Sequence, residues 1–176
     1  MNALDHLLAW CSGHIPLQTA RTHRFFYRLT ARRLGGRLPG YHILWLTAVG
    51  RKTGRPRTWP LIYFPAGDTL VVLASNNGAD THPQWYFNLL RTPQATIEVD
   101  GRARPVCART ATAEERARLW PVALRTFPLY EVVARRTQRE IPVVLLSPAA
   151  HDPCPPGMAV DKSVDKSVDN LVEKGA

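Results

Sequence analysis

The sequence predicts an α+β domain built around an antiparallel sheet or barrel. Three observations lead to this prediction. The chain has 176 residues, 45% of them hydrophobic, which suits one domain with one core. Short apolar runs bounded by turn residues fill its middle, and only three helical segments interrupt them. A doubly wound parallel sheet would need a helix after nearly every strand.

Six strands are predicted, over residues 42–49, 57–64, 69–74, 95–99, 102–109 and 141–147. The first two flank a loop that runs from Gly50 to Pro56 and can close a hairpin. The fourth and fifth flank Asp100-Gly101, a strong signal for a two-residue hairpin turn.

Three helices are predicted between these strands. Thr81-His82-Pro83-Gln84 fits a capping box with proline in the first turn and predicts a helix to residue 90. A second capping box, Thr112 to Glu115, predicts a helix to about residue 124. The third helical segment covers residues 128–136 and leads into the last strand.

The two ends of the chain differ from this central part. Residues 1–39 are predicted to be an amphipathic helical segment, in which Arg21, Arg24, Arg28 and Arg32 form one stripe. That stripe is either a solvated face over a docked apolar face or a contact with an anionic membrane. Residues 149–176 contain near-copies of Val-Asp-Lys-Ser and are predicted to be a low-complexity, disordered tail, with a short amphipathic helix as the alternative.

Charge and cysteine content narrow the class of protein. Lys and Arg number 23 against 14 Asp and Glu, a net charge of +9, which predicts an anionic partner such as a membrane surface, a phosphorylated small molecule or nucleic acid. The sequence contains no nucleic-acid-binding signature and no metal-ligand spacing, so neither nucleic acid nor a metal ion is expected as a partner. The three scattered cysteines suggest no disulfide framework and favour a reducing cytosol. The absence of a long apolar run or a signal peptide predicts a cytoplasmic protein.

Two polar segments could hold a ligand. Arg51, Lys52, Arg55 and Arg57 lie in a glycine-containing loop that is either a phosphate cradle or a solvated hairpin tip. The second segment, residues 74–88, leaves a strand through a small polar loop and meets a helix N-terminus, a suitable seat for an electron-rich heterocycle. Within it, a structural role is favoured for His82 and a core position for Trp85.

These segments resemble the deazaflavin-dependent nitroreductase family, whose members use coenzyme F420. The resemblance covers about residues 40–148, and its motifs lie at residues 46–61, 74–89 and 135–143. It implies a split β-barrel, related to flavin-reductase barrels, over residues 40–148. It also implies that Arg51, Lys52 and Arg57 hold the phosphate and acidic tail of the cofactor, with Arg55 at the rim. The deazaflavin ring would lie along Pro60, Leu61, Ser75, Asn76 and Gly78, with Trp85 and Asn88 closing the pocket.

The resemblance further implies a hydride transfer from reduced F420 to an organic acceptor. Tyr130 and Ser75 would form hydrogen bonds to that acceptor, because both carry hydroxyl groups. Phe127 and Val133 stand where relatives often carry tyrosine, so the mouth of the pocket is more apolar and a quinone is favoured over a nitroaromatic compound. The alternatives are a nitroaromatic reductase and a non-catalytic deazaflavin or flavin carrier. The basic N-terminal helix would place the enzyme at the periphery of an anionic membrane.

Overall fold

The structure is a computed structural model that describes residues 37–38, 41–149 and 154. Within these ranges antiparallel strands dominate. They are β1 (Arg37–Leu38), β2 (Tyr41–Val49), β3 (Pro56–Ala66), β4 (Thr69–Leu73), β5 (Gln94–Val99), β6 (Arg102–Thr110) and β7 (Val143–Pro148). The helices are the 3₁₀ turn η1 (Asn76–Gly78), α3 (Gln84–Arg91), α4 (Ala113–Thr126) and α5 (Leu129–Ala134).

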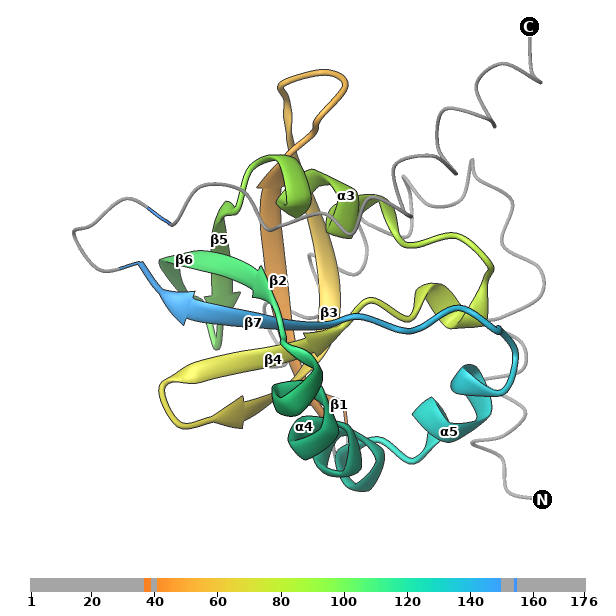
Figure 1. The fold of residues 1–176 in the computed structure, drawn as a ribbon. Helices are drawn as coiled ribbons and strands as arrows, with labels where there is room; N and C mark the ends of the chain where they lie inside the picture. Colours follow the sequence, from red (N-terminus) through yellow and green to blue (C-terminus); the bar gives the residue numbers. More distant parts are fainter. Residues whose placement is uncertain (1–36, 39–40, 150–153, 155–176) are drawn as a thin grey trace, which may run out of the picture.

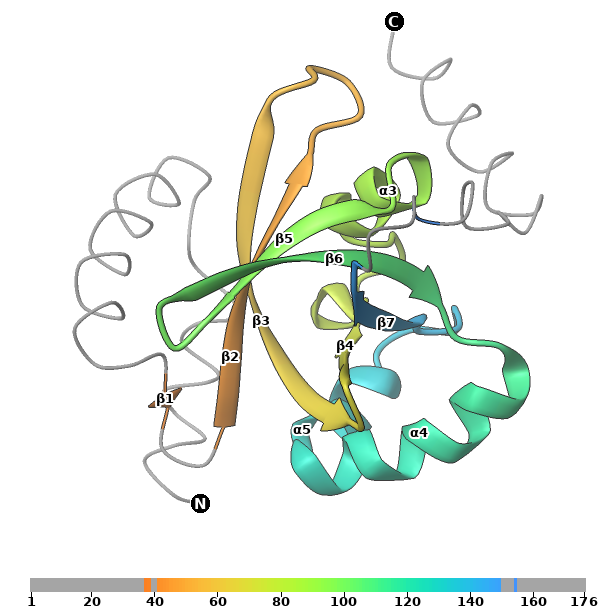
Figure 2. The ribbon, with the colours of Figure 1, turned by 90° about the vertical axis from the view of Figure 1, so that its left-hand side faces the viewer.

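Six of these strands close into a barrel. Their order is β2-β3-β4-β7-β6-β5, and β5 returns to pair with β2 (Figures 1 and 2). Closure passes through the middle of β2, where Leu46 is in register with Trp59 on one side and with Ile97 on the other. The barrel confirms the predicted α+β split-barrel class, and each predicted strand appears within two residues of its expected ends. β1 pairs with the start of β2, so residues 37–38 of the predicted helical segment 1–39 form a strand.

Strands β4 and β7 are apolar on both faces because both faces are covered. Leu70 and Val72 of β4 pack inside the barrel with Val144 and Leu146 of β7. The alternate residues of these strands pack outward against a second cluster that includes α4 and α5; they are Val71, Leu73 and Val143. Side chains alternate along a strand, so a continuous apolar run belongs to a strand buried between two layers.

The ends of the barrel carry different elements. The hairpin between β2 and β3 projects from one end of the barrel, while α4 and α5 lie together at the opposite end (Figures 1 and 2). Helix α3 buries Trp85, Tyr86 and Leu89 in the barrel core. Helix α3 therefore completes the barrel core, while α4 and α5 cover the outer face of β4 and β7.

One predicted helix start is confirmed and the other is wrong. At α4, the Oγ1 of Thr112 accepts a hydrogen bond from the Glu115 amide, and the Glu115 carboxylate accepts one from the Thr112 amide. At α3, no capping box forms around Thr81. Pro83 is the N-cap, with extended backbone angles and no side-chain cap. The helix begins at Gln84, two residues later than an N-cap at Thr81 would place it, because the proline ring fixes φ of Pro83 while its ψ stays extended.

A disulfide joins Cys107 of β6 to Cys154, with 5.6 Å between the two Cα atoms. This corrects the expectation that the scattered cysteines would form no disulfide. It also removes the cysteine-based reason for a reducing cytosol, because disulfides persist in oxidising compartments. Among the described residues, no helix is both long and apolar enough to cross a membrane. The predicted basic helix and most of the predicted disordered tail lie outside the described residues.

We expect reduction of the Cys107–Cys154 disulfide to lower stability by about 2–4 kcal/mol, because the bond closes a 47-residue separation. Thermal unfolding with and without dithiothreitol measures this change. The variant Cys107→Ser should unfold at the same temperature in both conditions. Peptide mapping that finds Cys107 as a free thiol in protein purified without reductant would contradict the assignment.

Candidate functional site

A cavity of about 700 Å³ lies between the barrel wall and the helices α3 and α5. Most of its lining is apolar, and a few polar groups are set into it, which is typical of a site for an organic ligand. The described residues that line it come from β3, the end of β4, the segment around η1, the start of α3 and the region of α5: Trp59, Pro60, Leu61, Ile62, Leu73, Ser75, Asn76, Asn77, Pro83, Gln84, Trp85, Phe127, Leu129, Tyr130, Val132, Val133 and Arg136.

The cavity brings together most of the residues predicted to surround the deazaflavin ring and the acceptor. Its lining includes Pro60, Leu61, Ser75, Asn76, Trp85 and Tyr130. Gly78 is buried beside it, and Asn88 is buried among the hydrogen bonds of the hairpin rather than in the lining. Arg51, Lys52 and Arg57 lie on the projecting hairpin, outside the lining. Most of the residues predicted for the ring and the acceptor therefore lie in one place, and the role of each stays a prediction.

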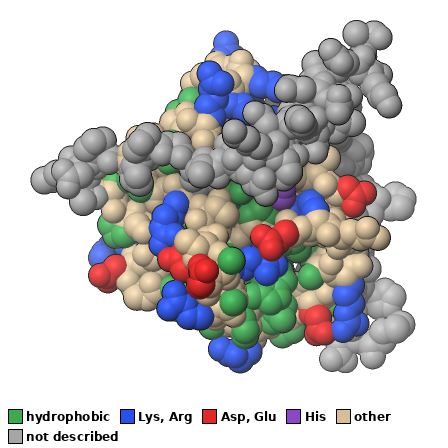
Figure 3. Space-filling view, in the orientation of Figure 1, with side chains coloured by type: hydrophobic (Ala, Val, Ile, Leu, Met, Phe, Trp, Pro, Cys, Tyr) green, Lys and Arg blue, Asp and Glu red, His purple; other side chains and the backbone are tan. Residues whose placement is uncertain are grey.

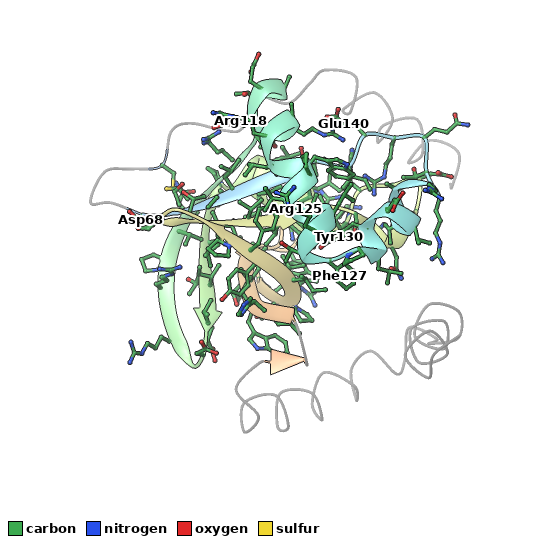
Figure 4. All side chains as sticks on the ribbon, turned by 90° about the horizontal axis from the view of Figure 1, so that it is seen from below. Asp68, Arg118, Arg125, Phe127, Tyr130 and Glu140 are labelled. Carbon is green, nitrogen blue, oxygen red and sulfur yellow. A yellow bond between two sulfur atoms is a disulfide. The ribbon has the colours of Figure 1, made fainter. Side chains whose placement is uncertain are left out.

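Tyr130 supplies a hydroxyl group at the α5 end of the cavity. Its side chain is 8% exposed, and its ring meets that of Phe127 edge to face at 4.9 Å (Figure 4). Burial raises the pKa of Tyr130 above its ordinary value, so the hydroxyl stays protonated at neutral pH. Within the described part of the chain, the hydroxyl groups of Tyr130 and Ser75 form no hydrogen bond. Both groups can therefore donate to a ligand.

The loop that carries Ser75 has an uncommon backbone conformation. Asn76, Asn77 and Gly78 follow one another with φ values of 47°, 58° and 80°. A Cβ atom at Gly78 would lie 2.7 Å from the carbonyl oxygen of Val133 and 2.7 Å from the Cβ of Arg136. Only glycine permits this close approach, which packs the Ser75 loop directly against α5. Ser75 and Tyr130 are thereby held on adjoining parts of one wall.

Arg139 holds this loop through hydrogen bonds to its backbone. Its guanidinium group donates to the carbonyl oxygens of Ser75 at 2.7 Å, Ala79 at 2.8 Å and Ala74 at 3.3 Å. It also donates to the carbonyl oxygen of Glu140 at 3.3 Å and to Nδ1 of His82 at 2.9 Å. One planar group therefore fixes both ends of the segment from Ala74 to His82. Sequence reasoning placed Arg139 in a family motif but did not foresee this role, because its partners lie about 60 residues away.

His82 is neutral in this arrangement. Because Arg139 can only donate, Nδ1 of His82 accepts and the ring proton sits on Nε2. Burial, followed by the positive charge of Arg139, lowers the pKa of His82 from 6.5 to about 4. The predicted structural role of His82 agrees with this geometry.

The hairpin between β2 and β3 gathers positive charge at one end of the molecule (Figure 3). The amide of Arg51 donates to Oδ1 of Asn88 at 3.1 Å, and its guanidinium group donates to Oε1 of Gln84 at 2.8 Å. Since Gln84 also lines the cavity, Arg51 links the hairpin to the pocket. Lys52, Arg55 and Arg57 are exposed, and within the described ranges they form no ion pair. Such a cluster suits a phosphate or carboxylate group.

The residues fit a ligand that combines a flat apolar ring with an acidic tail. Comparison with known families identifies that ligand, since residues 19–148 match the family profile described as F420H(2)-dependent quinone reductase. The chain belongs to this family. The match begins at residue 19, earlier than the resemblance over residues 40–148 had indicated.

Individual relatives agree with the assignment. The F420H(2)-dependent quinone reductase Rv1261c of Mycobacterium tuberculosis is 36% identical over 142 residues, which cover 78% of this chain and 95% of that protein. A solved F420-H2 dependent reductase, FDR-A, superposes with a TM-score of 0.55 at 31% identity, over 60% of this chain and 93% of the other. A structure described as a domain-swapped dimer gives a TM-score of 0.56 at 29% identity, over 72% and 99%.

Family membership confirms three predictions. The chain is an oxidoreductase, its cofactor is F420, and its acceptor is a quinone.

We expect the free energy of unfolding to fall as the pH decreases from about 6.5 toward about 4. In this range His82 is protonated in the unfolded chain but still neutral in the folded protein. Urea unfolding across this range, with a ¹H–¹⁵N titration of His82, measures the effect. His82→Gln should flatten the dependence in this window. Arg139→Gln should raise the pKa of His82, since a neighbouring positive charge is removed. A wild-type His82 that titrates near 6.5 would contradict this assignment.

Proposed function

We propose that the cavity holds the ring of F420 and the quinone together, and that Tyr130 and Ser75 orient the quinone. The observation that carries this proposal is an apolar cavity lined by two hydroxyl groups that have no partner among the described residues. When bound, reduced F420 supplies the hydride. The protein provides the walls, the orientation and the hydrogen bonds.

The walls suit these two flat molecules. Pro60 and Leu61 of β3 and Trp85 of α3 form one apolar part of the lining, and Phe127 and Val133 form another. The apolar surfaces exclude water, and in such surroundings a hydrogen bond to an acceptor oxygen is stronger than in solution. Tyr130 can donate this bond throughout the neutral pH range, because its raised pKa keeps the proton in place.

The hairpin would hold the acidic part of the cofactor. Hydrogen bonds to Asn88 and Gln84 already hold Arg51, so less ordering of this side chain is needed when a ligand binds. Lys52 and Arg57 are exposed and free to meet phosphate or carboxylate oxygens. Peripheral attachment to an anionic membrane through residues 21–32 stays a prediction, because that segment lies outside the described residues.

The function is tested by following the absorbance of reduced F420 with purified protein and menaquinone, and in parallel with a nitroimidazole. Faster oxidation with menaquinone supports the proposal. Faster oxidation with the nitroimidazole would favour a nitroaromatic reductase. Tight binding of F420 without oxidation by either acceptor would favour a carrier.

We expect Tyr130→Phe to lower kcat with menaquinone by about 10- to 100-fold, because it removes a donor to the oxygen that gains charge. The dissociation constant of F420, measured by fluorescence, should change less than twofold. Tyr86→Phe is the matched control. Its hydroxyl lies outside the cavity and bonds Thr110 at 3.1 Å, so stability decreases while kcat is kept. Equal losses of kcat in both variants would exclude the proposed role of Tyr130.

Replacement of the hairpin cations should weaken cofactor binding in a salt-dependent manner. We expect Lys52→Ala and Arg57→Ala each to raise the dissociation constant of F420 by about threefold to tenfold at low salt, and less at high salt because ions screen exposed charges. Fluorescence titration measures both conditions. Arg102→Ala, at the turn between β5 and β6, removes a similar exposed charge away from the hairpin and should have no effect. A loss of the same size in that control would show that only net charge matters.

A further inference from the structure

Arg136 occupies a position in the cavity that neither the fold nor the predicted cofactor contacts explain. It lies just after α5, and its side chain lines the cavity together with Tyr130 and Ser75. Among the described residues of that lining it is the one charged group. No carboxylate of the described residues pairs with it, and its guanidinium group forms no hydrogen bond within that part of the chain.

The neighbouring arginine shows that this charge could have been neutralised locally. Arg135 forms an ion pair with Glu131, one helical turn earlier on α5. Arg136, one residue later, has no such partner among the described residues and is one of the residues that line the cavity. The two side chains are equal in charge and adjacent in sequence, but only Arg135 is held in an ion pair.

The stem of Arg136 is held in place. An added Cβ at Gly78 would meet the Cβ of Arg136 at 2.7 Å and its Cδ at 3.3 Å, so the aliphatic part packs against the glycine. This contact places the base of the side chain beside the loop of Ser75 and near the carboxyl end of α5. Arg136 therefore belongs with Tyr130 to the part of the cavity lining around α5. The cationic hairpin lies at the opposite end of the barrel from α5 (Figures 1 and 2).

The reaction creates negative charge at the acceptor. The quinone gains two electrons and one proton as a hydride, and a second proton completes the hydroquinone. Reduced F420 loses one hydride and one proton, so the step balances. Until the second proton arrives, the hydroquinone carries a negative charge on one oxygen. A nearby cation lowers the free energy of that oxyanion.

We propose that Arg136 stabilises the negative charge that develops on the quinone oxygen, acting beside the hydroxyl of Tyr130. This inference rests on the proposed function of the cavity and goes beyond it by assigning the cation that meets the acceptor. It predicts that the cavity prefers an anionic quinone to a neutral one of the same shape. Because Arg136 is exposed at the rim, solvent weakens its effect relative to that of a fully buried donor.

Three variants separate charge from packing. Arg136→Met keeps an unbranched stem against Gly78 and removes the charge, whereas Arg136→Lys keeps the charge. Arg135→Met removes the adjacent charge that is paired with Glu131. With menaquinone we expect kcat to fall about tenfold in Arg136→Met, to stay within about threefold in Arg136→Lys, and to remain unchanged in Arg135→Met.

A binding measurement tests the charge without turnover. Protein saturated with oxidised F420 is titrated calorimetrically with the anion of 2-hydroxy-1,4-naphthoquinone and with neutral 2-methoxy-1,4-naphthoquinone. Wild type should bind the anion more tightly, and Arg136→Met should lose about tenfold in affinity for the anion but not for the neutral compound. Equal effects in Arg135→Met, equal losses in the Met and Lys variants, or a weakened affinity for F420 in place of the anion would each overturn the proposal. A wild-type protein that prefers the anion but does not oxidise reduced F420 would overturn the proposed function alone.

Discussion

The site depends on the hydrogen bonds that the guanidinium group of Arg139 donates to the segment from Ala74 to His82. That segment contains three successive residues with positive φ, a conformation that costs free energy and needs support from its surroundings. A guanidinium group can satisfy several carbonyl oxygens at once in one plane, which a lysine ammonium group cannot do. With this support, the loop presents Ser75 to the cavity and leaves the backbone of Gly78 free to meet α5.

The barrel makes that support rigid. Arg139 stands shortly before β7, and the segment it holds follows β4, so both depend on the pairing of these two strands. The pair is buried on both faces, by the interior of the barrel and by α4 and α5. Interiors packed in this way deform little. The positions of Ser75 and Tyr130 are therefore set by the two apolar layers, and not by the loops alone.

The sequence predicted the features that depend on local chemistry. Short apolar runs bounded by turn residues located six strands, and the hydroxyl and carboxylate spacing at Thr112 located the start of α4. It did not predict two other features. Thr81 has the same spacing as Thr112, yet its carbonyl oxygen accepts a hydrogen bond from the Asn76 side chain, Pro83 is the N-cap and the helix starts at Gln84. The pairing of Cys107 with Cys154 likewise depends on where the chain runs after β7.

The charged and polar groups of the proposed site differ in their position relative to the cavity. The hairpin cations are exposed and lie outside the cavity lining, so they can attract an acidic tail but their effect is weakened by salt. Inside the lining, the neutral hydroxyl of Tyr130 is able to donate a hydrogen bond, and the strength of such a bond depends on burial and not on ionic strength. Arg136 is intermediate in burial between these two cases, because its aliphatic carbons pack against Gly78 while the residue as a whole is exposed. A cation at that boundary can stabilise a charge that exists only during reduction, without the cost of burying a permanent charge in an apolar cavity.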